Sequence, residues 1–160
     1  MIKDISADLL AYVTAEMFES TAFMFLEPAE QTPWTDAPEA DALISAEVSF
    51  SHADERARLV IAASAGFSAE LAGNLLGLDG DDEEAKSGGP AAVGEMANII
   101  AGFLVAQMYG DVVIDIGPPV VGKTSGSALT AQLPTTMSSA VFEEDEAGWV
   151  GVFAYGPGAA

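Results

Sequence analysis

The chain contains 160 residues, of which 50% are hydrophobic, and its 25 Asp and Glu against 5 Lys and Arg give a formal net charge of −20. Its length predicts one domain over residues 1–160 with a single core, and its apolar content argues against disorder. The negative charge repels phosphate backbones and anionic lipids, which argues against nucleic acid and membrane surfaces as partners. Because cysteine is absent, disulfides, thiolate catalysis and Cys-ligated metals are excluded.

The first ten residues do not have the pattern of a targeting segment. They lack a basic stretch followed by an apolar run, and no uninterrupted apolar stretch in the chain approaches about 18 residues. We therefore expect a cytoplasmic protein. Solubility or a saline habitat explains the acidic composition without a partner, although acidic patches can also assist docking to a basic surface.

The first half of the chain predicts a helix followed by a hairpin. Ser6 can cap a helix that runs to residue 26, with apolar residues at three- and four-residue steps. A proline-rich loop follows at 28–38. Alternating residues predict a strand over 42–51, and a second strand over 56–64 follows a short turn.

The second half begins with a short helix over 67–76 and an acidic loop over 78–89. Pro90 suits the first turn of a longer helix over 90–109, because its missing N–H would have no helical partner there. Further strand segments are then expected at 111–116, briefly at 129–133, and in a final hairpin at 136–143 and 148–155. Tight turns between consecutive strands predict an antiparallel sheet with the helices on one face, which is a two-layer α+β fold.

The helix over 90–109 has one apolar face and one unusual polar face. Glu95 and Asn98 are neighbours on the polar face, and Ala91 and Gly102 flank them with almost no side chain. A solvated helix face would ordinarily favour Lys, Arg, Glu or Gln, and both Asn and Gly weaken a helix. We interpret this face as one that keeps a carboxylate and an amide accessible to a closely approaching partner.

The segment GEMANIIAG at 94–102 resembles the Glu-x-x-Asn helix of the CheC/CheX chemotaxis phosphatases, and the order of elements is most similar to the CheX branch. The resemblance implies a phosphatase that hydrolyses the phosphoaspartate of a CheY-type response-regulator receiver domain, in chemotaxis or related two-component signalling. Glu95 would engage the receiver's lysine, and Asn98 would orient the attacking water. No cofactor of its own is implied, since Mg²⁺ is expected on the receiver.

The sequence departs from the family pattern at two places. Ala91 stands where the family often has Ser or Asp, and Pro118 and Pro119 fit the family's strand proline only approximately. These departures keep an alternative open, namely a non-catalytic receiver-binding or scaffold module of the same fold.

The first helix would be the pseudo-symmetric counterpart of the site helix. In that alignment three of its residues match the site positions: Tyr12, Glu16 and Glu19. Glu19 falls where Asn98 stands in the later helix, and a carboxylate cannot donate to a phosphoryl oxygen. We therefore predict one working site per chain.

The resemblance also implies a homodimer formed through the sheet. The aromatic strand at 148–155, GWVGVFAY, contains no Lys, Arg or Pro to protect it, so it is the expected pairing edge. The charge of −20 opposes association, which predicts a tighter dimer at higher salt.

Other motifs carry less weight. The segment GPPVVGKT at 117–124 matches the phosphate-binding P-loop pattern, but Pro118 and Pro119 remove two backbone donors and a poor helix follows, so nucleotide binding is rejected. His52 is the only histidine, which excludes a multi-histidine metal site. The acidic loop lacks the register of a calcium-binding loop.

Overall fold

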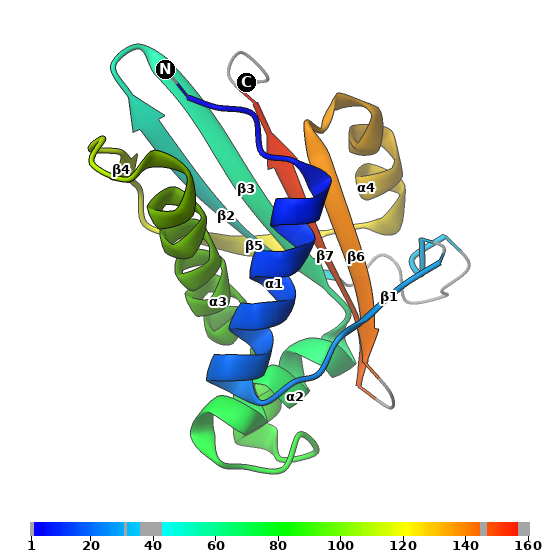
Figure 1. The fold of residues 1–160 in the computed structure, drawn as a ribbon. Helices are drawn as coiled ribbons and strands as arrows, with labels where there is room; N and C mark the ends of the chain where they lie inside the picture. The colour runs from blue at the N-terminus through cyan, green and yellow to red at the C-terminus, as the bar shows by residue number, and fades with distance from the viewer. Residues whose placement is uncertain (1, 31, 36–42, 145–146, 157–160) are drawn as a thin grey trace.

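A seven-stranded antiparallel sheet forms the centre of the protein. The computed structural model describes residues 2–30, 32–35, 43–144 and 147–156. The strand order is β1-β6-β7-β3-β2-β4, and β5 also pairs with β2. Figure 1 shows α1 and α3 side by side across one face of this sheet. The predicted α+β class with an antiparallel sheet is confirmed.

The elements follow one another in the order helix, hairpin, two helices and terminal strands. The strands are β1 (Glu27–Pro28), β2 (Leu43–His52), β3 (Glu55–Ala63), β4 (Asp115–Ile116), β5 (Val120–Thr124), β6 (Ser138–Glu144) and β7 (Gly148–Tyr155). The helices are α1 (Ala7–Ala22), α2 (Ala65–Leu76), α3 (Glu83–Tyr109) and α4 (Gly126–Gln132), followed by a 3₁₀ turn at Leu133–Thr135. Both predicted hairpins, β2–β3 and β6–β7, are present.

Strand alternation divides the apolar residues between the two faces of the sheet. Leu59 and Ile61 of β3 belong to the main core under α1, α2 and α3, whereas Val60 and Ala62 belong to a smaller cluster on the opposite face. That second cluster includes Leu129 of α4. The second face is therefore partly covered, and the short helix α4 covers it.

α3 begins at Glu83 rather than at Pro90, so the prediction of an acidic loop over 78–89 is wrong for most of its length. Glu83 and Glu84 lie in the first turn, where carboxylates complement the positive end of the helix dipole. Pro90 lies inside the helix. Gly88 and Gly89, which precede Pro90, do not mark a helix start. They let α3 pack closely against α2, because a Cβ on Gly89 would lie 2.8 Å from the hydroxyl oxygen of Ser68 in α2.

Two other boundaries differ from the prediction. α1 ends at Ala22 instead of residue 26, because Phe23 adopts a left-handed conformation with φ 53° and the Asn74 side chain of α2 donates to the Ala22 carbonyl at 2.8 Å. The strand pairing predicted at 129–133 is wrong, since these residues lie in α4 and the start of the 3₁₀ turn. The Ser125 hydroxyl caps α4 by accepting from the Ala128 N–H, which stabilises a sequence of weak helix formers.

The strand expected at the sheet edge lies inside the sheet. β7 pairs with β3 on one side and with β6 on the other, so the prediction that it offers a free edge is wrong. Its apolar composition reflects burial on both faces. β5 pairs with β2 alone among the described strands.

α3 is also long and apolar enough, by length and composition, to cross a membrane, and it is the one such helix in the described part of the chain. Core helices of globular proteins meet the same criterion. Here Met96, Ala97 and Ile100 are buried in the main core, which accounts for the hydropathy of this helix.

Two helical glycines make a matched test of this packing. We predict that Gly73→Ala lowers the free energy of unfolding, because its Cβ would lie 2.8 Å from the Leu78 carbonyl oxygen. Gly102→Ala should raise it by about 0.5–1 kcal/mol, since open space surrounds that position and alanine favours a helix. Urea unfolding of both variants measures the difference. Equal stabilisation by the two changes would contradict the proposed packing at Gly73.

Candidate functional site

Glu95 and Asn98 lie on the exposed face of α3, as the sequence predicts. The buried neighbours Met96, Ala97 and Ile100 fix the helix against the core, while Glu95 and Asn98 are exposed to solvent. Residues three apart on a helix have their Cβ atoms about 5–6 Å from each other, so the carboxylate and the amide can act on one partner group.

The two side chains have no partner within the part of the chain that the structure describes. Neither Glu95 nor Asn98 makes a hydrogen bond or an ion pair there. Gly102 stands one turn beyond Asn98, and a Cβ placed on it would meet no atom within 4 Å. The Asn98 amide therefore keeps its full hydrogen-bonding capacity, with open space beside it for a partner's backbone.

α1 and β5 border this face of α3. The Thr21 hydroxyl lies 3.9 Å from the Met96 sulfur, and the Lys3 ammonium donates to the Met108 carbonyl at 3.0 Å, so α1 runs antiparallel to α3. On the other side β5 packs closely, because Gly94 has no side chain where a Cβ would lie 2.7 Å from Val121 Cγ2. We did not predict from the sequence that Gly94 leaves room for β5. The position of Gly94 directly before Glu95 was the one signal for this role.

The counterpart residues of α1 are exposed in the same way. Tyr12, Glu16 and Glu19 all face solvent, and the two carboxylates make no ion pair with a described residue. The fold thus presents two similar helix faces, of which the α3 face carries the Glu and Asn pair and the α1 face carries two carboxylates.

Large apolar side chains are exposed where α1 and α2 end. Phe23 and Phe25 follow α1 and are 73% and 68% exposed, and Leu76 at the end of α2 is 61% exposed. Leu76 Cδ1 lies 3.8 Å from the position of a Cβ on Gly88 in α3.

The described residues contain no group of three or more His, Cys, Asp or Glu that could hold a metal ion. The segment GPPVVGKT does not form a phosphate loop, because its second half is β5, which pairs with β2 in the register Ile44 to Lys123. Its backbone is therefore engaged in a sheet ladder where the motif requires a phosphate-cradling loop.

Comparison with known proteins places the fold. No protein-family model matches the chain, and no curated protein matches it. Among solved structures it is similar to the chemotaxis protein CheX from Vibrio vulnificus, with 18% identity, a TM-score of 0.63, and coverage of 97% of this chain and 99% of that one. It is also similar to a chain of the CheX–CheY–BeF3–Mg²⁺ complex from Borrelia burgdorferi, with 17% identity, a TM-score of 0.65, and coverage of 96% and 98%.

FliY from Thermotoga maritima matches more distantly, with 14% identity, a TM-score of 0.54, and coverage of 98% of this chain and 92% of that one. The chain therefore has the α+β fold of these chemotaxis proteins. More particularly, it has the fold of CheX and CheC-like chemotaxis proteins.

The exposure of the pair gives a prediction about stability. Asn98→Ala should raise the free energy of unfolding by up to about 0.7 kcal/mol, because it replaces a poor helix former on an exposed face with the best one. Glu95→Ala should change it by no more than about 0.5 kcal/mol. Thermal and urea unfolding measure both effects. A loss of more than 1 kcal/mol in either variant would mean that the residue has a structural role instead.

Proposed function

We propose that this protein acts in the cytoplasm as a phosphatase for the phosphoaspartate of a CheY-type receiver domain, in chemotaxis or related two-component signalling. One observation carries the proposal: Glu95 and Asn98 stand exposed and unpartnered among the described residues, on one face of a helix held by the core of a CheX-like fold. The CheX–CheY complex from Borrelia burgdorferi supports a receiver as the partner.

Phosphoryl transfer asks mainly for positioning, which an amide and a carboxylate on a fixed helix can supply. In this mechanism the receiver brings the phosphoaspartate, the metal ion and a lysine. The Asn98 carbonyl accepts a hydrogen bond from the attacking water, and its NH₂ group donates to a neighbouring oxygen. The water oxygen bonds to phosphorus as the bond to the aspartyl oxygen breaks, which releases inorganic phosphate and the free carboxylate.

Glu95 fixes the register of the complex. Its carboxylate accepts a charge-assisted hydrogen bond from the receiver lysine, which aligns Asn98 with the phosphoryl group. The small residues Ala91, which is exposed, and Gly102, which has open space beside it, would let the receiver backbone approach on either side of the pair. A rate gain of about a hundredfold would require only about 2.7 kcal/mol of transition-state stabilisation.

Substitution of the pair tests the function. We expect Asn98→Ala to lose most of the phosphatase activity with little change in receiver affinity, because it removes the group that orients water. Glu95→Ala should weaken receiver binding as well as turnover. Phosphate release from phosphorylated receivers of the same genome measures activity, and titration with a beryllofluoride-treated receiver measures binding.

The α1 face supplies the matched controls. Glu16→Ala and Glu19→Ala remove carboxylates that are also exposed, from a helix of the same fold, and should leave turnover nearly unchanged. A loss comparable to that of Asn98→Ala would place a working site on α1. Wild-type activity in both Glu95→Ala and Asn98→Ala would refute the assignment of the site.

The second candidate is a receiver-binding or scaffold module without catalysis. Ala91, in place of the Ser or Asp that the resemblance leads one to expect, favours it. Both candidates give receiver binding, but only the phosphatase accelerates dephosphorylation, so the same assay separates them.

We further propose a homodimer, now through β5 instead of β7. β5 has one strand neighbour among the described strands, β2, but Lys123 within it and Pro118 and Pro119 before it restrict the pairing length. We expect a dimer that strengthens with salt, because screening reduces the repulsion between two chains of charge −20. Sedimentation at micromolar concentration measures it, and a monomer at both low and high salt would contradict it.

A further inference from the structure

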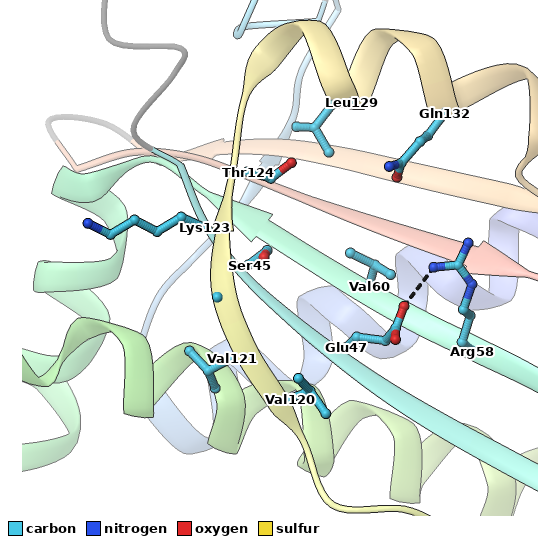
Figure 2. Close-up of a pocket in the computed structure, with 11 residues that line it drawn as sticks. Ser45, Glu47, Arg58, Val60, Val120, Val121, Lys123, Thr124, Leu129 and Gln132 are labelled. Atoms are coloured by element: carbon cyan, nitrogen blue, oxygen red, sulfur yellow. Dashed lines mark hydrogen bonds and ion pairs between the residues drawn. The ribbon is translucent and has the colours of Figure 1, made fainter.

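A pocket of about 240 Å³ lies on the face of the sheet opposite α1, α2 and α3. Figure 2 shows β2 and β3 as its floor, β5 along one side and α4 above it, with Leu129 and Gln132 pointing toward the floor. Its lining combines a charged pair, an amide, two hydroxyl groups and several valines. Lys123 also lines it, but Figure 2 shows the Lys123 side chain pointing away from the charged pair. The proposed phosphatase reaction uses none of these groups.

The charged pair is Glu47 of β2 and Arg58 of β3. The Arg58 Nη1 atom donates to Glu47 Oε1 at 2.6 Å, and both side chains remain partly exposed. The guanidinium also lies over the ring of Tyr155, with its central carbon 3.9 Å from the ring centroid. Arg58 therefore has a fixed orientation, yet it keeps further N–H donors, and Glu47 keeps its second oxygen.

Gln132 is oriented by the same network. The Tyr155 hydroxyl donates to Gln132 Oε1 at 3.1 Å, and burial raises the pKa of Tyr155, so the phenol keeps its proton. The NH₂ group of Gln132 is left free to donate, because it has no hydrogen bond to a described residue. Figure 2 shows this amide and the Arg58 guanidinium facing one another across the pocket.

The rest of the pocket is lined by hydroxyl and apolar groups. The hydroxyls of Ser45 and Thr124 make no hydrogen bond to a described residue. Val60 and Leu129 supply the apolar surface between them and the charged pair. The volume of about 240 Å³ is below the roughly 300–1,000 Å³ of sites for drug-sized ligands, so a small ligand fits this space.

We propose that this pocket binds a small zwitterion of the α-amino acid class. The ligand carboxylate would accept from Arg58 and Gln132, and its ammonium would donate to Glu47. An anion alone would face the Glu47 carboxylate, and a cation alone would face the Arg58 guanidinium. A ligand with both charges on neighbouring groups matches both, and its zero net charge avoids repulsion by a chain of charge −20.

NMR titration of the ¹⁵N-labelled full chain tests this proposal. Each common L-amino acid is added in turn up to millimolar concentration, and at least one should give saturable shifts at Ser45, Gly122 and the Gln132 side chain. The Asn98 side chain, on the other side of the sheet, should not respond. Analogues of the best binder that lack either the ammonium or the carboxylate should bind at least about tenfold more weakly, because each loses a hydrogen bond between charged groups.

Two variants complete the test. Gly122→Val fills the pocket, so it should remove binding. It should not lower the unfolding midpoint, because its Cβ would meet only the Ser45 hydroxyl, at 4.0 Å, and because valine suits a strand. Glu47→Gln keeps the side-chain length but leaves Arg58 uncompensated, so the preference should shift to the analogue without the ammonium. The proposal is overturned if no amino acid binds, if that analogue binds the wild type equally well, or if binding survives Gly122→Val.

Discussion

The close packing of α3 against its neighbours is the constraint on which the rest of the structure depends. Gly89 lets α2 approach from one side, Gly94 lets β5 approach from another, and Met96 and Ile100 fill the space above the sheet. Because these contacts surround the helix on its buried sides, only one face remains exposed. That face holds Glu95 and Asn98 on a rigid element, as the proposed positioning of water requires.

The two faces of the sheet differ in electrostatic character. On the helix side, α1 and α3 both carry exposed carboxylates, which suit a partner that brings a lysine. On the opposite side, Glu47 and Arg58 neutralise each other and leave polar atoms free in a small pocket. A receiver and a small zwitterion would therefore be recognised by different chemistry, through surfaces that do not overlap.

The proposed function assigns activity to only one of two similar helix faces. Glu16 and Glu19 of α1 have the same spacing as Glu95 and Asn98 of α3, and the first residue of each pair is a glutamate. The difference lies in Glu19 against Asn98. A carboxylate offers no donor and would repel a phosphoryl group, whereas an amide can both accept and donate.

The sequence by itself determined the features that follow from local periodicity. Alternating residues defined both hairpins, and the helical spacing of Glu95 and Asn98 placed them together on an exposed face. These patterns need no knowledge of the rest of the chain, because they depend on the repeat of a strand or a helix. The α+β class followed from the order of such elements.

Only the tertiary structure decided which surfaces meet. It placed β7 inside the sheet, made residues 126–132 a helix capped by Ser125, and continued α3 through Pro90, where packing against α2 outweighs the local signal for a helix start. It also brought Glu47, Arg58 and Gln132 to one pocket from distant parts of the sequence. Strand order and helix docking arise from burial between distant segments. Local propensity does not determine which segments will meet.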